Sequence, residues 1–285
     1  MMTVLEAAAR PGAAATLEPR AERLLSKLRQ VRKDPSDEDA VHDARVAARR
    51  LLAAGELWAP LEPGWKDARD RLSKVIRRLG RVRNLDVTIR FLGRAFFGNA
   101  ASRGELAEVL KRQRRKERRR LSEWMTGRRI RSLEGKLRWV RRPGRNGQTG
   151  RLPAPADLDR YFDRLLEVTS KVNLRAGVEA GHEARRELRR LRYAHETLAS
   201  AYEVGRFQSA SKRFVRAQDL AGRWHDLCVL EELGRKAIRK GKGSGRLTPL
   251  VDRARSEANR QLPGFVREIQ ALAGLRSQLT GAGRP

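Results

Sequence analysis

One short pattern occurs twice in this chain, and it constrains the possible fold more than any other feature. The pattern is His-x-x-Arg-x-x-x-Arg-Arg-Leu; one copy begins at His42 and the other at His182, 140 positions later. On a helix each residue advances by about 100°, so the histidine and the next two pattern arginines share one stripe. In the first copy these are His42, Arg45 and Arg49. Two matched stripes predict two similar helical modules.

The apolar residues around the first copy place this cationic stripe beside the protein core. Val41, Ala44, Ala48 and Leu51 fall within an arc of about 80° on the same helical wheel, which predicts a buried face. The stripe borders that arc, whereas charges kept only for solubility would lie across the helix from it. The arginines should therefore project along the rim of a helical bundle and line a groove.

A glutamate follows each histidine at the same distance. Glu56 and Glu196 stand fourteen residues after His42 and His182, within the cationic stripe. A carboxylate there can hold an arginine in position through a bidentate hydrogen bond. The alternative is a pair of ordinary surface helices with ion pairs one turn apart, each worth about 0.2–0.5 kcal/mol.

A second set of cations repeats with spacings of three and seven, which keep each set on one helix face. The sets are Arg71, Lys74 and Arg81 in the first half and Arg213, Arg216 and Arg223 in the second. Their offset is 142 positions against 140 for the histidines. A duplicated module should change length in its loops and keep its phase in its helices.

The remaining pattern predicts an all-α chain, because hydrophobic residues reach 40% while aromatics stay at 5% and strand-like alternation is scarce. Helices are expected at about 18–33, 37–59, 65–81, 84–97, 105–125 and 126–142, then at 157–175, 179–203, 206–224, 226–240 and 248–274, with a kink at Pro263. The expected organisation is a loose tail at 1–16, a first bundle at 17–142, a linker at 143–156, a second bundle at 157–275 and a C-terminal tail at 276–285.

The charge balance points to polyanionic partners. Lys and Arg total 64 against 34 Asp and Glu, a formal net charge of +30. Such a surplus attracts nucleic acid, anionic lipid or inorganic polyphosphate, and arginine suits phosphate oxygens through its planar fork. Cys228 is the sole cysteine, which excludes an intrachain disulfide. With no signal peptide and no membrane-spanning stretch in the sequence, a cytoplasmic protein is expected.

Four segments resemble the conserved histidine α-helical domain (CHAD) family: residues 41–50, 79–87, 182–193 and 218–227. The resemblance spans about residues 18–275. It implies two pseudo-symmetric four-helix bundles around a central basic cavity that binds inorganic polyphosphate. Asn84 and Cys228 depart from the family pattern, which has Asp at these places. The Glu-x-Glu-x-Lys signature of a hydrolase domain often fused to this family is absent, so a standalone module is expected.

The candidate site combines the repeated stripes with their neighbours. The predicted polyphosphate-binding residues are His42, Arg45, Arg49, Arg50, Arg71, Lys74, Arg81, His182, Arg185, Arg189, Arg190, Arg192, Arg213, Arg216 and Arg223. Glu56 and Glu196 are the predicted orienting carboxylates. Tyr193 either extends the groove or packs at its rim. Each site histidine is expected to be neutral in the free protein, because nearby arginines disfavour its cation, and to gain a proton when the polyanion enters.

The other histidines have structural interpretations. His195 falls on the apolar arc and is expected to be a hydrogen-bonded core residue. His225-Asp226 resembles the dipeptide of metal phosphohydrolases, but Asp226 as a helix cap explains it equally, and four histidines are few for such a metal site. No P-loop and no Ser or Cys nucleophile motif is present. We therefore expect no catalytic residue, cofactor or metal.

The function expected from the sequence is non-catalytic binding of inorganic polyphosphate, with localisation to polyphosphate granules as a consequence. The alternative is a basic helical protein that binds nucleic acid, for which weak and non-specific binding is expected in any case. The basic run from Arg112 to Arg120 is open between a solvated helix face and a second anion-contacting surface.

Overall fold

The computed structural model describes residues 13–58, 64–94, 98–141, 153–172, 177–202 and 205–280. The first half contains α1 (Ala13–Lys33), α2 (Glu38–Trp58), α3 (Trp65–Arg94), α4 (Ala100–Trp124) and α5 (Gly127–Lys136). The second half contains α6 (Asp159–Ser170), α7 (Gly177–Tyr202), α8 (Gly205–Arg239), α9 (Thr248–Ala273) and α10 (Arg276–Thr280). Three short 3-10 turns complete it, at Arg138–Arg141, Pro155–Leu158 and Gly245–Leu247. These ranges hold no β-strand, which confirms the all-α prediction.

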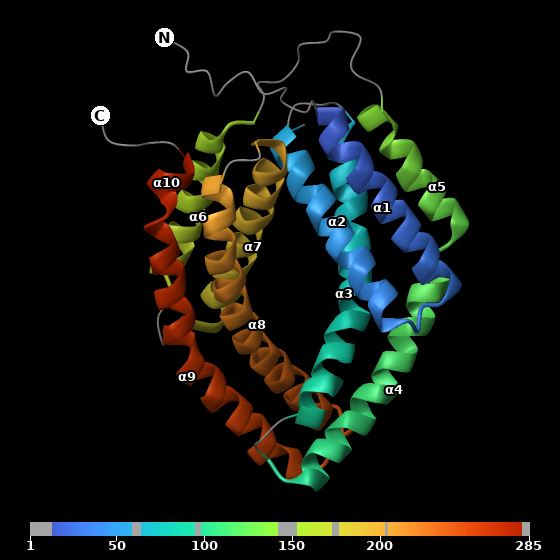
Figure 1. Ribbon diagram of the computed structural model, residues 1–285. Coiled ribbons are helices and arrows are strands. Elements are labelled where there is room, and N and C mark those ends of the chain that lie inside the picture. The colour runs from blue at the N-terminus through green and yellow to red at the C-terminus, as the bar shows by residue number, and fades with distance from the viewer. Residues whose placement is uncertain are drawn as a thin grey trace, which may run out of the picture.

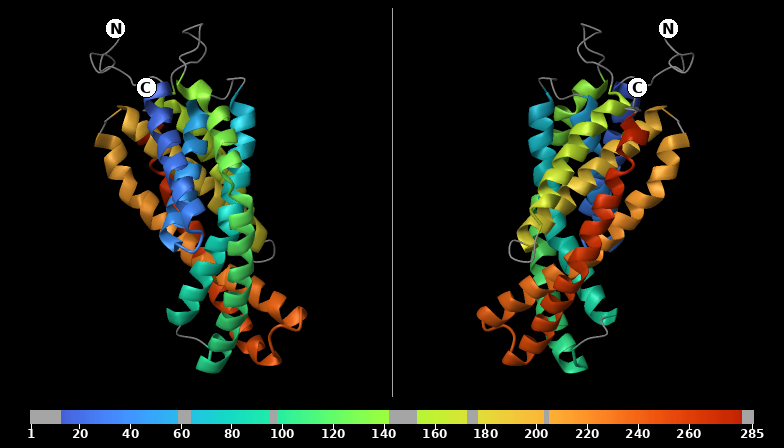
Figure 2. Two further views of the ribbon diagram at one scale, coloured as in Figure 1. Left: turned by 90° about the vertical axis from the view of Figure 1, so that its right-hand side faces the viewer. Right: turned by 90° about the vertical axis from the view of Figure 1, so that its left-hand side faces the viewer.

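The helices form two arms (Figure 1), with α1–α5 on one side and α6–α10 on the other. The arms meet at one end of the molecule, at the bottom of Figure 1, where α3 and α4 contact α8. Figure 2 shows that the ends of α8 and α9 project beside α3 and α4 at this meeting point. Nearer the opposite end, α2 contacts α7. The matched helices α2 and α7 therefore lie face to face. The internal duplication itself stays a prediction.

Two apolar clusters hold this arrangement. The larger cluster runs through both arms and includes Leu51 and Leu79 of the first arm and Phe162 and Trp224 of the second. The smaller cluster joins α3, α4, α8 and α9 where the arms meet. It contains Leu85, Leu92, Leu106, Val109, Leu110, Leu230, Ala237, Leu247, Leu250 and Ala254. Because both clusters cross from one arm to the other, burial of apolar surface sets the distance between them.

The start of α2 is capped by the residue that precedes it, Asp37. The Asp37 carboxylate accepts hydrogen bonds from the backbone N–H groups of Asp39 and Ala40, both at 2.9 Å. These are N–H groups that the first turn of a helix leaves without an intrahelical partner. This cap fixes where α2 begins, and hence the phase of its His–Arg stripe.

Two predicted helix breaks are wrong. We expected a new helix at Asn84 and another at Asp226, but α3 and α8 run uninterrupted through both positions. The apolar stripe continues across them, with Val82 and Leu85 buried around the first and Trp224 buried before the second. Burial of a continuous stripe outweighs the weak local preference of Asn and Asp for helix starts.

The predicted ends of the chain also need adjustment. Helix α1 begins at Ala13, inside the segment predicted as a tail, and α10 occupies residues predicted as the C-terminal tail. The Pro/Gly-rich segment at 142–152, which makes up most of the predicted linker, lies outside the described residues. Helix α9 contains Pro263 within its length.

The contact between α2 and α3 yields a test of packing. Gly55 lies against the Trp65 indole so closely that an added Cβ would overlap its ring atoms. We expect Gly55→Ala to lower the free energy of unfolding by about 1–3 kcal/mol, as overpacking does. In urea denaturation the matched control Gly104→Ala, whose Cβ would meet nothing within 4 Å, should instead raise it by about 0.5–1 kcal/mol. Equal effects at both positions would contradict the packing described here.

Candidate anion-binding site

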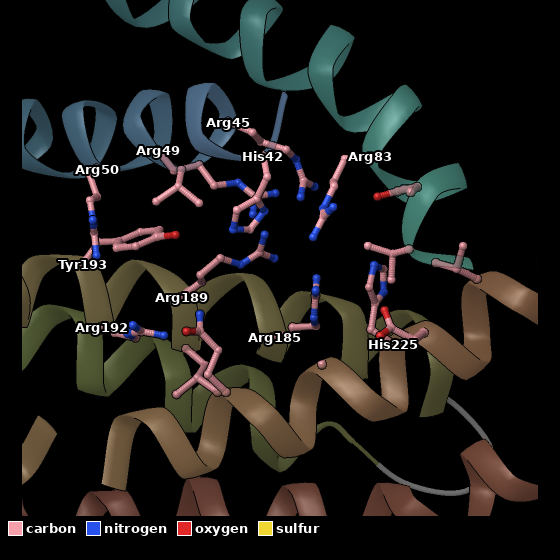
Figure 3. A pocket seen from close by; sticks show the side chains of 18 of the residues that line it. His42, Arg45, Arg49, Arg50, Arg83, Arg185, Arg189, Arg192, Tyr193 and His225 are labelled. Carbon is pink, nitrogen blue, oxygen red and sulfur yellow. The ribbon is translucent and has the colours of Figure 1, made fainter. Parts of the chain in front are cut away.

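A cavity of about 440 Å³ lies between α2, α3, α7 and α8. Its charged lining is mostly arginine: Arg45, Arg49, Arg50, Arg83, Arg185, Arg189 and Arg192, with Asp226 as the single carboxylate among the described lining residues. His42, Tyr193 and His225 complete the functional lining. Figure 3 shows side chains from α2 and α3 pointing across the cavity toward those from α7 and α8.

Four of these arginines lie half-buried as a group of like charges. Burial lowers the pKa of Arg45, Arg49, Arg185 and Arg189 to about 9, and the arginines add to the shift by repelling one another. A hydrogen bond from Arg49 to the Tyr193 hydroxyl offsets a part of this. The cluster is thus costly in the free protein, and an entering anion would relieve both the desolvation and the repulsion.

Some of the donors in the cavity lack a protein acceptor. Arg45 Nε and Arg83 Nη1 are buried with no hydrogen-bond partner in the described part of the chain. Arg45 lies across α3 at Gly80, where an added Cβ would come to 3.5 Å from Nε. The Arg45 guanidinium therefore packs against the backbone of α3 at Gly80. Buried donors without acceptors are uncommon, and they mark a position where a ligand atom would be bound.

Glu196 bridges the two arms at one end of the cavity. Its carboxylate accepts hydrogen bonds from Arg50 Nε at 3.2 Å and from Arg192 Nε at 2.8 Å. Its geometry is that of the predicted orienting carboxylate. Glu56 differs, because it lines a neighbouring cavity of about 200 Å³ that shares Arg49, Arg189 and Tyr193 with the central one. Burial raises the pKa of the Glu56 carboxyl, against the opposing effect of Arg190.

The histidines are held in their neutral form. His182 Nδ1 and His225 Nδ1 are 3.4 Å apart, a contact in which one ring nitrogen must act as acceptor. Burial, followed by repulsion from Arg185, lowers the pKa of His182 to about 4 and that of His225 to about 2. The pKa of His42 is also lowered, first by burial and then by Arg83. Burial therefore lowers the pKa of each histidine more than the neighbouring arginines do, although the sequence analysis named only the arginines.

The structure separates the predicted site residues into two groups. Those brought to the cavity are His42, Arg45, Arg49, Arg50, Arg185, Arg189 and Arg192. His182 lies directly behind, between His225 and Trp224, with ring centroids 5.2 and 4.8 Å away. Tyr193 lines the groove as well as packing at its rim.

The structure does not bring the predicted cation sets of α3 and α8 to the central cavity. The affected residues are Arg71, Lys74, Arg81, Arg213, Arg216 and Arg223, all exposed and outside the cavity lining. Arg190 is likewise exposed and pairs with Glu187 at 2.7 Å. A repeated spacing shows that residues share a face, but it does not show which face the neighbouring helices cover.

Arg83 and His225 replace these sets in the cavity, and sequence reasoning missed both. They stand 142 positions apart, which is also the offset between the repeated cation sets of α3 and α8. The same repeat could therefore have pointed to Arg83 and His225. Asp226, interpreted as a helix cap, instead lines the cavity from the middle of α8. Burial raises the pKa of its carboxyl, while Arg185 and Arg83 lower it.

Three further expectations concern His195, metal binding and membrane-spanning helices. His195 is 1% exposed and packs between Phe207 and Phe214, which confirms its placement in the core. Within the described ranges, no three His, Cys, Asp or Glu side chains gather closely enough to hold a metal ion. In the same ranges, each helix is too short or too polar to span a bilayer.

Two solved structures share this fold. The crystal structure of the CHAD domain from the plant Ricinus communis matches with a TM-score of 0.71 and 19% identity, over 95% of this chain and 93% of the other. PptA from Streptomyces chartreusis matches with a TM-score of 0.64 and 18% identity, over 91% and 97%. No curated protein sequence matches. The family model of the CHAD domain matches residues 15–235, most of the chain, and the protein therefore belongs to the CHAD family.

Proposed function

We propose that this protein binds inorganic polyphosphate in the central cavity. The observation that carries the proposal is the pair of opposing arginine rows, Arg45 and Arg49 on α2 and Arg185 and Arg189 on α7, half-buried without enough carboxylate to neutralise them. A linear polymer with about one negative charge per phosphate would place oxygens against both rows at once. The guanidinium groups are already desolvated and in position, so little ordering remains to oppose binding.

The dimensions and charge of the cavity favour a thin, flexible anion. A volume of about 440 Å³ is too small for a nucleic-acid duplex. A duplex is wider than its own major groove, which already measures about 12 Å. The cations also extend from Arg50 and Arg192 at one end to Arg83 and Arg185 at the other (Figure 3), so several phosphate units in a row would be contacted. We assign no reaction step to this site. Binding of this kind would hold the protein on polyphosphate granules.

Removing the opposing rows should abolish most of the binding. In the variant Arg45→Gln/Arg49→Gln/Arg185→Gln/Arg189→Gln, the dissociation constant for medium-chain polyphosphate should rise by ~100-fold or more, because each hydrogen bond to a charged group contributes about 1.5–3 kcal/mol. Isothermal titration calorimetry would measure it. Thermal unfolding would show that the variant folds; relief of buried repulsion should leave its melting temperature unchanged or raised.

The matched control removes the same charge from exposed positions outside the cavity: Arg71→Gln/Lys74→Gln/Arg213→Gln/Arg223→Gln. Its affinity should fall by less than about threefold at physiological salt, because exposed charges are screened. Equal losses in the two variants would show that net charge, and not the cavity, attracts the polymer.

Binding should take up protons and strengthen as the pH falls. The pKa of His182 and that of His42 are lowered in the free protein, so both rings are neutral at pH 7, and a bound polyanion raises them by favouring the imidazolium. Affinity should therefore increase on going from pH 8 to pH 6. Calorimetry in buffers of different ionisation enthalpy would measure the uptake, and His42→Gln/His182→Gln should reduce it. Affinity that falls between pH 8 and pH 6 would count against this role.

A further inference from the structure

The basic run on α4 is divided between two faces of the helix. Arg114 and Arg118 point toward α3, where Arg118 Nη2 lies 3.1 Å and Arg114 Nη1 3.4 Å from Asp86 Oδ1. Arg114 Nη1 also contacts Glu38 Oε1 of α2 at 3.0 Å. Because the Asp86 side chain is fully buried, this face anchors α4 to the rest of the first arm. It is not available to a ligand.

The opposite face of α4 borders a second groove, separate from the central cavity. This groove measures about 690 Å³ and lies between α4 and the C-terminal end of α8, at the end of the molecule where the arms meet (Figures 1 and 2). Its cations are Arg112, Arg115, Lys116 and Arg120 from α4 and Lys236, Lys240 and Lys242 from the end of α8 and the turn that follows. We call it the α4–α8 groove.

The cations of the α4–α8 groove are mostly unneutralised. Within the described ranges, Arg120 alone among them pairs with a carboxylate, that of Glu117 at 2.7 Å. Elsewhere on α4 the cations outside the groove are paired, as Lys111 is with Glu108 and Arg119 with Glu123. The cations from Arg112 to Arg120 follow the helix for about 12 Å at 1.5 Å per residue. Two rows of mostly unpaired cations, one from α4 and one from the end of α8, thus line the groove.

Between these rows the floor of the groove is apolar. Val109, Leu233 and Ala237 line it. A bare phosphate chain has no apolar surface to place on such a floor, whereas a nucleotide has its base and sugar. This feature separates the α4–α8 groove from a simple extension of the central cavity.

An aromatic side chain stands where the groove ends on α4. Arg120 also lines an adjoining hollow of about 410 Å³, together with Trp124 and Arg129. The Arg129 and Arg78 guanidinium carbons lie 5.2 and 5.8 Å from the Trp124 ring centroid. Two guanidinium groups therefore already lie over this ring, and the hollow extends the row of cations beyond the end of the groove.

We propose that the α4–α8 groove binds single-stranded nucleic acid through its phosphate backbone, with sugars and bases over the apolar floor. The two rows leave a trough for one strand. This binding is independent of the central cavity, since the residues that line the two sites are different.

The test uses the full chain and a fluorescein-labelled single-stranded oligo(U), followed by fluorescence anisotropy. In Arg112→Gln/Lys116→Gln/Lys240→Gln, affinity should fall by about tenfold, and the slope of log affinity against log salt should become shallower by about 2. The control Arg71→Gln/Lys74→Gln/Arg213→Gln removes equal charge from exposed positions outside the groove. It should retain most of the affinity and of the slope.

A second arm separates this groove from the central site. The variant with four substituted cavity arginines should bind oligo(U) as the unmodified protein does, and the groove variant should keep its polyphosphate affinity. The proposal is overturned if the unmodified protein does not bind oligo(U), or if groove and control variants lose equally. It is also overturned if the cavity variant loses oligo(U), or if the groove variant loses polyphosphate in place of oligo(U). The oligo(U) outcomes do not depend on whether polyphosphate binds centrally.

Discussion

The fold has to hold four like charges close together against their mutual repulsion. Arg45 and Arg49 face Arg185 and Arg189 across the cavity, where the four side chains are half-buried and Arg45 Nε has no acceptor in the described part of the chain. Such a cluster pushes the arms apart, so apolar burial must oppose it. The large core crosses from arm to arm behind the cavity, and the smaller one joins the arms at their meeting end. The Glu196 bridge between Arg50 and Arg192 adds a polar connection across the cavity.

The distribution of carboxylates turns a general surplus of charge into two distinct sites. Acidic residues pair with arginines on outer surfaces, as Glu231 does with Arg235, or anchor helices, as Asp86 does. Few are left for the cavity or for the α4–α8 groove. The two sites then differ in their physics. Half-buried and pre-positioned arginines favour a thin anion that can replace their lost water, whereas the exposed side chains of the groove attract polyanions from solution.

Sequence reasoning identified most of the cavity residues on α2 and α7, with Arg190 as an exception, and missed those on α3 and α8 for one identifiable reason. Around His42 the small apolar residues form a single narrow arc, so the face toward the core was unambiguous. Helix α3 carries cations on several faces, including Arg71, Arg78 and Arg83, and a repeated spacing among them could not select the cavity face. The same ambiguity hid the division of α4, where Arg114 is anchored while Arg112 is free.

What the sequence by itself determined is the helical class, the family resemblance and the phase of the two His–Arg stripes. The helical class and the phase of each stripe are properties of single helices, set by local periodicity and capping. Only the tertiary structure decided that α2 and α7 face each other, that Arg83 and His225 join their cavity, and that α4 and the end of α8 enclose a second groove. Helical periodicity assigns residues to a face, but the partner of that face is chosen by packing between segments far apart in the chain.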